Sequence, residues 1–137
     1  VDLDTKITQN YNKPLQTLLN ELGTNAFIQL EENTLLALDF ENKVVAPGGS
    51  LIYSQKAMEK CQETGIIIYL EDTFENIKNK IHNPTERGIV GLTSYSLKDI
   101  FDERQPLYEH YAMITIACQD KSWDSITQEI LDQYQSR

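Results

Sequence analysis

The chain has 137 residues, which suits one domain built around one hydrophobic core. Its 21 Asp and Glu residues outnumber its 12 Lys and Arg residues and give a formal net charge of −9. Because so acidic a surface repels phosphates and anionic lipid headgroups, we expect neither a nucleic-acid nor a membrane partner. The two cysteines, Cys61 and Cys118, form no Cys-x-x-Cys pair, and they indicate reduced thiols in a cytoplasmic protein.

Helical periods alternate with short apolar runs along the chain, a pattern typical of βαβ units. The leucines of segment 15–22 follow the i, i+3, i+4, i+7 rule and predict a first amphipathic helix. Further helices are predicted after residue 24, over 54–64, after 72, around 96–103, from Pro106 onward and around 126–134. Strands are predicted at 43–46, 66–70 and 113–117, with 66–70 covered on both faces because it is continuously apolar.

The predicted fold is a single α/β domain over residues 1–137. We expect three α/β/α layers with a parallel sheet, because parallel strands need crossover helices between them. Three strands make a thin sheet, and one strand is missing from the expected set. Segment 83–95 holds one Pro, two Gly and no clear period, which predicts a mobile loop.

Two short motifs lie where strands end and ligands bind in open α/β sheets. The first is Asp2-x-Asp4, whose carboxylates can hold Mg²⁺ or substrate hydroxyls, or can serve as a helix cap. The second is the pair Gly48 and Gly49, which lets backbone amides approach a ligand or forms an ordinary turn.

Arginine is rare in this chain. Apart from the last residue, only Arg87 and Arg104 occur, and both fall in or next to non-repetitive segments. The rigid guanidinium fork suits carboxylates and phosphates, so both are candidates for anion binding. The alternative is a surface ion pair with Glu86 or Glu103.

Taken together and in order, six segments resemble the shikimate kinase family. They are "VDLDTKI", "ELGTNAFIQLEENTL", "VVAPGGS", "GIIIYLEDTFENI", "ERGIVG" and "IFDERQPLYEHYA". The last is similar to the Arg-x-Pro-Leu-Tyr segment of that family. The resemblance implies a P-loop fold of the nucleoside-monophosphate-kinase type and phosphoryl transfer from ATP to the 3-hydroxyl of shikimate, with Mg²⁺.

The resemblance also implies roles for single residues. Asp2 would lie near Mg²⁺, and Asp4 would bind shikimate hydroxyls and assist deprotonation. Gly48 and Gly49 would hold shikimate through their amides. Arg104 would bind the shikimate carboxylate, and Arg87 would be a catalytic lid residue that closes on the transferred phosphate of ATP, with 83–95 as the lid.

The chain departs from the family pattern in two ways. No glycine is followed by lysine, so the Gly-x-x-x-x-Gly-Lys-Ser/Thr loop is absent from these residues. We therefore expect an incomplete fragment whose N-terminal strand and P-loop lie outside the sequence, and which is inactive by itself. Ile28 stands where the family has a second arginine for the carboxylate.

The sequence therefore predicts a monomeric, cytoplasmic shikimate kinase that acts in aromatic amino-acid biosynthesis. Two alternatives stay open. One is a non-catalytic protein of the same fold that serves as a binding module. The other is a related small-molecule kinase with a different polyol substrate. Ile28 favours both alternatives.

Overall fold

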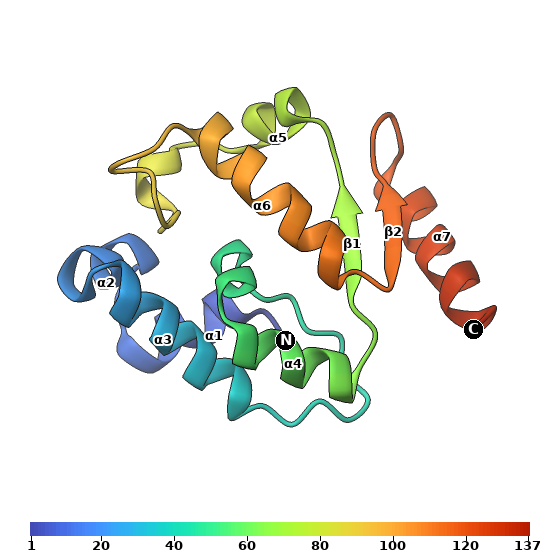
Figure 1. Ribbon diagram of the computed structural model, residues 1–137, viewed down its shortest axis with the longest axis horizontal. Helices are drawn as coiled ribbons and strands as arrows, with labels where there is room; N and C mark the ends of the chain where they lie inside the picture. The colour runs from blue at the N-terminus through green and yellow to red at the C-terminus, as the bar shows by residue number, and fades with distance from the viewer.

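A computed structural model describes all of residues 1–137 and shows seven α-helices, two short 3-10 helices and a two-stranded parallel sheet (Figure 1). In chain order the elements are α1 (Leu3–Tyr11), α2 (Leu15–Leu22), α3 (Thr24–Leu36), η1 (Gly49–Tyr53), α4 (Gln55–Thr64), β1 (Ile68–Glu71), α5 (Phe74–Lys80), η2 (Pro84–Glu86), α6 (Leu97–Tyr111), β2 (Ile114–Ala117) and α7 (Trp123–Gln135). None of the helices combines the length and apolar composition that a membrane span requires.

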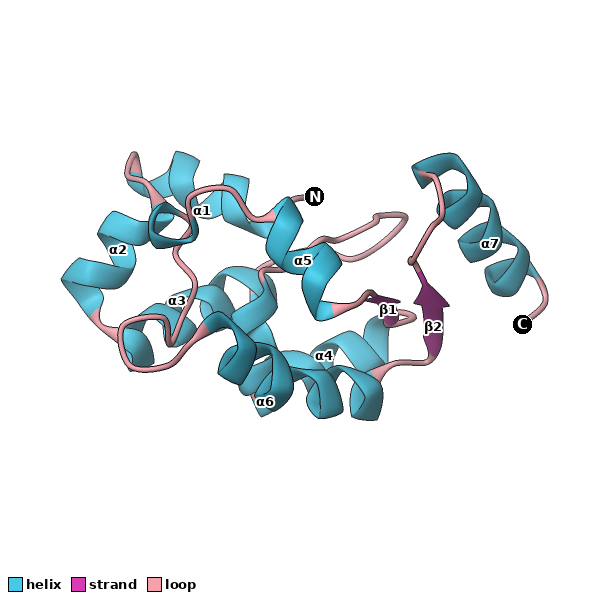
Figure 2. Ribbon diagram, turned by 90° about the horizontal axis from the view of Figure 1, so that it is seen from above, coloured by secondary structure: helices cyan, strands magenta, loops and turns pink.

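The two strands pair in parallel, with Ile68 opposite Ile114 and Glu71 opposite Ala117. Helices α5 and α6 connect them, as a parallel crossover requires. Figure 2 shows α7 beyond β2, and α4 and α6 on the opposite side of the strand pair. The prediction of an α/β fold with a parallel sheet is therefore confirmed.

The predicted strand at 43–46 is wrong. Only Ala46 pairs, in a single parallel bridge with Asp2, and the side chain of Val44 is 87% exposed. The bridge rests on the amide of Leu3 donating to the Ala46 carbonyl at 3.0 Å and the amide of Ala46 donating to the Val1 carbonyl at 2.7 Å. The amino group of Val1 also donates to the Val44 carbonyl at 2.6 Å, but no second residue of the segment forms a bridge, so the ladder is one residue long.

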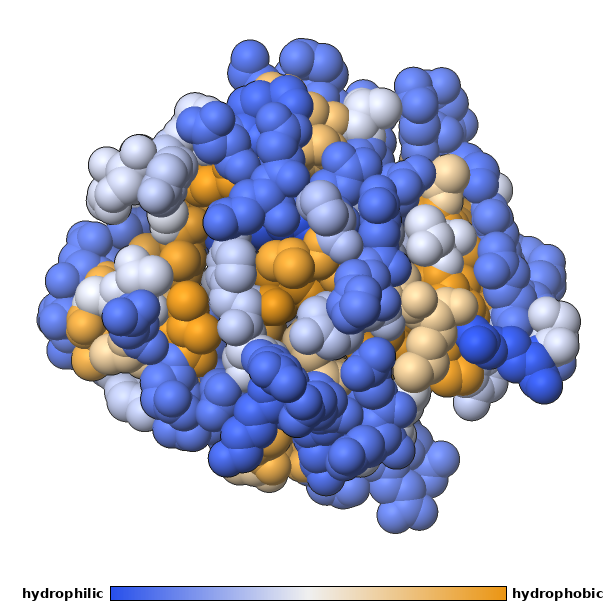
Figure 3. All heavy atoms as spheres, viewed as in Figure 1, coloured by the Kyte–Doolittle hydropathy of each residue, from blue (hydrophilic) through white to orange (hydrophobic).

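The predicted strand at 66–70 forms, but its bounds and its burial differ from the prediction. It runs from Ile68 to Glu71, and Leu70 is 44% exposed. β1 has a hydrogen-bonded neighbour on one side only, namely β2. The prediction that this strand is covered on both faces is therefore wrong. Figure 3 shows apolar side chains at the surface on the side of the molecule where the strands lie.

The two predicted helices on either side of Pro106 are one helix, α6. Ser96 and Asp99 start it with a reciprocal capping box. Pro106 removes one backbone hydrogen bond, yet the helix continues to Tyr111. Because the helix is continuous, Arg104 and Tyr108 lie one turn apart on the same face.

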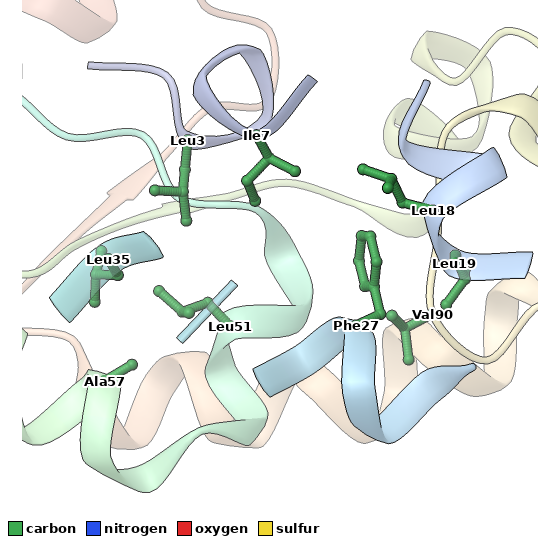
Figure 4. Packing of buried hydrophobic residues seen from close by; sticks show 9 residues of the cluster. All are labelled: Leu3, Ile7, Leu18, Leu19, Phe27, Leu35, Leu51, Ala57 and Val90. Atoms are coloured by element: carbon green, nitrogen blue, oxygen red, sulfur yellow. The ribbon is translucent and has the colours of Figure 1, made fainter. Parts of the chain in front are cut away.

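Most of the core lies among the first four helices. Nine buried residues pack together there (Figure 4): Leu3, Ile7, Leu18, Leu19, Phe27, Leu35, Leu51, Ala57 and Val90. A smaller cluster of four, from Ile114 to Ile126, joins β2 to α7. Val90 belongs to segment 83–95, so this loop is tied to the main core at that point.

Candidate functional site

A cavity of about 290 Å³ opens between α1, α3, α6 and segment 87–90. Five of the six predicted site residues line it: Asp4, Gly48, Gly49, Arg87 and Arg104. They come from four separate parts of the chain, and the fold brings them together. Asp2 does not line the cavity.

The first turn of α1 separates the roles of the two aspartates. The Asp2 carboxylate accepts a hydrogen bond from the amide of Thr5 at 3.1 Å, so it caps the helix, as one of the two sequence interpretations states. Asp4 is half-buried in the cavity wall. Burial raises the pKa of its carboxyl group, and the nearby charge of Asp2 raises it further, while Arg87 lowers it.

Glu31 is a buried carboxyl group that the sequence analysis did not identify. It is 2% exposed, lines the cavity from α3, and accepts a hydrogen bond from the Ser50 hydroxyl at 2.5 Å. Burial raises its pKa to about 7, against the lowering effect of the Ser50 hydrogen bond. A signal was present in the sequence, because Glu31 lies four residues from both Phe27 and Leu35 and so falls within the apolar stripe of the helix.

The two glycines are needed for space. A Cβ atom on Gly48 would lie 2.9 Å from a carboxylate oxygen of Asp4 and 2.9 Å from one of Glu31. A Cβ atom on Gly49 would lie 2.9 Å from Arg104 Nη1 and 2.9 Å from the Tyr108 hydroxyl. Any other residue would push these polar groups away from the cavity. The backbone amides of both glycines donate to no acceptor within the protein, because Gly48 is the N-cap of η1 and Gly49 is its first residue.

Arg104 is 8% exposed and is held by three contacts. Its Nη2 donates to the Val90 carbonyl at 3.1 Å, and its Nε donates to the Tyr53 hydroxyl at 3.3 Å. Its Cζ lies 5.3 Å from the centre of the Tyr53 ring. The five ion pairs of the structure all use lysine, so the surface ion pair with Glu103 that we considered for Arg104 does not form.

Arg87 differs in every one of these respects. It follows η2 in the loop, its side chain is exposed, and its guanidinium makes no hydrogen bond or ion pair, including none with Glu86. The next residue anchors the loop: the amide of Gly88 donates to Gln16 Oε1 at 3.1 Å. The backbone next to Arg87 is therefore held in place, while its guanidinium, which lines the cavity, has no partner within the protein.

Ile28 does not line this cavity. It lies in a neighbouring depression together with Tyr53 and Glu103, and Val90 and Ile100 form part of both walls. The absence of a second arginine therefore leaves Arg104 as the one buried cation of the site.

No group of three or more His, Cys, Asp or Glu side chains is arranged to hold a metal ion. The carboxylates of Asp2 and Asp4 are the candidates for a magnesium site that the protein shares with its substrate. Asp2 is close enough to Asp4 for its charge to raise the pKa of the Asp4 carboxyl group. Mg²⁺ is usually held by one or two carboxylates together with waters and substrate phosphates, so this pair fits that mode of binding.

Comparison with known proteins points to one family. The family described as shikimate kinase matches residues 1–135. A shikimate kinase of Persephonella marina is 30% identical over 96% of this chain and 80% of its own length. A solved shikimate kinase of Acinetobacter baumannii in complex with shikimate matches with a TM-score of 0.86 and 25% identity, over 98% of this chain and 77% of that one.

A shikimate kinase structure from Bacteroides thetaiotaomicron has the same fold, with a TM-score of 0.82 and 24% identity over 98% of this chain and 82% of its own. The family match covers nearly the whole chain, and the relatives and solved structures that resemble it carry the same name. The chain belongs to the shikimate kinase family, whose members are ATP-dependent phosphotransferases.

Proposed function

We propose that this protein phosphorylates the 3-hydroxyl of shikimate with ATP, a step that serves aromatic amino-acid biosynthesis. The observation that supports it most is the single cavity that gathers a half-buried carboxylate, two close-packed glycines and a buried, anchored arginine. Shikimate has one carboxylate and several hydroxyls, and these groups match it in charge and hydrogen bonding. A homologous enzyme of known structure binds shikimate.

The binding roles follow from chemistry and position. Arg104 offers a guanidinium to the carboxylate of shikimate. The free amides of Gly48 and Gly49 donate to shikimate oxygens from the part of the cavity wall that lies beside Asp4, Glu31 and Arg104, where a glycine leaves room that a Cβ atom would take up. Asp4 accepts hydrogen bonds from hydroxyl groups. These contacts orient the acceptor hydroxyl, which matters because phosphoryl transfer depends mainly on positioning and charge neutralisation.

Asp4 is the proposed catalytic base. Its carboxylate takes the proton of the 3-hydroxyl while that oxygen bonds to the γ-phosphorus of ATP and the bond from this phosphorus to the bridging oxygen breaks, releasing ADP. Burial strengthens Asp4 as a base by raising its pKa. The free guanidinium of Arg87 is proposed to neutralise charge on the transferred phosphate, with 83–95 acting as the lid of a single domain.

Asp2 is proposed to hold Mg²⁺ with the help of Asp4. When bound, Mg²⁺ supplies positive charge to the phosphate oxygens. We further propose a monomeric protein in the cytoplasm, in keeping with its two free cysteines and its use of ATP. Light scattering of the purified protein tests the first point.

A coupled assay of ADP release tests the activity, with the 137 residues joined to a strand and P-loop of the family type, because these residues contain no Gly-Lys-Ser/Thr loop to bind ATP. The expected result is ADP release that depends on both shikimate and Mg²⁺, together with formation of shikimate 3-phosphate. ADP release with another polyol but not with shikimate would support the related small-molecule kinase instead. Saturable shikimate binding by calorimetry without any phosphate transfer would support the non-catalytic binding module.

A further inference from the structure

Tyr53 is a polar residue beside the cavity to which neither the family pattern nor the proposed mechanism assigns a task. It ends η1, three residues after Ser50, and its side chain is half-buried. Its hydroxyl accepts a hydrogen bond from Arg104 Nε at 3.3 Å and donates one to Glu103 Oε2 at 2.7 Å. The ring of the same residue lies against the Arg104 guanidinium.

These contacts restrain Arg104 in two directions. The ring limits movement perpendicular to the guanidinium plane, and the hydroxyl limits rotation within that plane. The Val90 carbonyl holds Nη2 from another side. Nε and Nη2 are thus occupied by Tyr53 and Val90, and Nη1 is the guanidinium nitrogen that remains for a ligand. It lies beside Gly49, at the wall of the cavity.

Glu103 sets the direction of the Tyr53 hydroxyl. Because its carboxylate can only accept, the hydroxyl proton of Tyr53 points to Glu103 and a lone pair points to Arg104. The negative charge of Glu103 strengthens this bond, and the hydrogen bond is one reason why the pKa of Tyr53 is raised, after burial. Glu103 thus acts on Arg104 through Tyr53 and not by an ion pair.

The substitution at position 28 makes this restraint important. A guanidinium has high rotamer entropy, so its affinity for an anion depends on how well it is held before binding. Where two arginines contact one carboxylate, the carboxylate stays bound to one of them when the other moves away, so little affinity is lost. Here Ile28 lies in the neighbouring depression, and Arg104 works without a second cation.

We propose that Tyr53 is a positioning residue that holds Arg104 with Nη1 turned to the carboxylate of the acceptor, and that Glu103 orients Tyr53 for this task. The proposal rests on the proposed function, because it assumes that Arg104 binds the carboxylate of shikimate. It does not require that Tyr53 touch the substrate.

The test is a double-mutant cycle between Tyr53→Phe and Arg104→Ala in the full chain, with shikimate affinity measured by calorimetry. We expect Tyr53→Phe to raise the Kd for shikimate about three- to tenfold when Arg104 is present. In the Arg104→Ala background the same change should alter the Kd by less than about 1.5-fold. In steady-state kinetics of the protein with a P-loop joined to it, KM for shikimate should rise while kcat and KM for ATP stay nearly constant, as expected for uniform binding.

Two further variants control for folding. Tyr134→Phe removes an exposed tyrosine hydroxyl on α7, far from the cavity in sequence, and should leave the Kd unchanged. Glu103→Gln keeps the Tyr53 ring and replaces the charged acceptor by a neutral one, so it should raise the Kd about twofold, again only when Arg104 is present. Its exposed position makes it the variant that decides the matter should Tyr53→Phe fail to fold.

The possible failures are distinguishable. A wild-type protein that does not bind shikimate overturns the proposed function and this inference with it. If the wild-type protein binds shikimate but Tyr53→Phe leaves the Kd unchanged, or raises it equally with and without Arg104, Tyr53 does not position Arg104. The proposed function then stands and only this inference is lost.

Discussion

The two sides of the cavity are built differently. One side, the inner wall, consists of Glu31, Ser50 and Arg104, which are buried and hydrogen-bonded to the protein. The other side, the outer rim, includes Arg87, whose guanidinium is exposed and has no partner. The side chains of the wall are therefore held by the protein before any ligand binds, whereas no contact within the protein fixes the charge of Arg87 at the rim.

This difference fits a division of labour in which the wall selects the acceptor and the rim serves the transferred phosphate. A preformed wall lowers the entropic cost of binding a small, rigid acid. A free guanidinium at the rim can follow a phosphate that changes position during transfer. The four predictions below test this contrast, from the largest expected effect to the smallest.

Asp4 lies where wall and rim meet, and its removal should have the largest effect. We expect Asp4→Asn to lower kcat about 100- to 10,000-fold, the range for loss of a general base. The Kd for shikimate should change less than about tenfold, since the amide still forms hydrogen bonds. The exposed Asp124→Asn on α7 is the matched control. A kcat within threefold of wild type, roughly the scatter of such assays, would remove Asp4 from the chemistry.

Replacing the two arginines separately compares wall and rim directly. Arg104→Ala should weaken shikimate binding about ten- to a hundredfold or more and leave binding of Mg-ATP unchanged. Arg87→Ala should lower kcat and leave the Kd for shikimate unchanged. Calorimetry and steady-state kinetics measure both. If Arg87→Ala weakened shikimate binding as much as Arg104→Ala, the contrast between wall and rim would have no functional meaning.

Glu31 makes the wall sensitive to pH. Its pKa is about 7 in the folded protein against 4.5 for the unperturbed group, so the folded state holds this proton over a range where the unfolded state has released it. The free energy of unfolding should therefore fall as pH rises from about 4.5 to above 7, by about 3 kcal/mol from this residue. Below pH 4.5 both states are protonated and the contribution is fully retained.

Urea unfolding of wild type and Glu31→Gln measures this contribution as a difference, so that the other carboxylates cancel. We expect the variant to become the more stable of the two as pH rises through about 7. A stability difference that does not vary with pH would show that Glu31 keeps an ordinary pKa in the wall.

Ile28→Arg should have the smallest effect. A new arginine could reach the carboxylate of shikimate and lower KM, but Ile28 shares its depression with Tyr53 and Glu103, which would compete for the guanidinium. We expect KM for shikimate to fall by roughly threefold or less. A tenfold fall would mean that the introduced arginine crosses into the cavity and completes a second contact.

Local patterns in the sequence were enough for much of the fold. The apolar period and flanking residues of segment 15–22 predicted α2, and the apolar runs at 66–70 and 113–117 predicted the two strands of the parallel sheet. The order of six short segments indicated the family. The scarcity of arginine drew attention to Arg87 and Arg104, and both line the cavity.

Other features depended on contacts between distant segments. The pairing of Glu31 with Ser50, the support of Arg104 by Tyr53, and the position of Ile28 outside the cavity join residues 19 or more positions apart. Segment 43–46 has the apolar character of a strand, yet it pairs at Ala46 alone. The periods of a helix or strand are set by neighbouring residues, so the sequence by itself determined them. Burial, ladder length and the orientation of a side chain depend on what packs against each segment, and only the tertiary structure decided them.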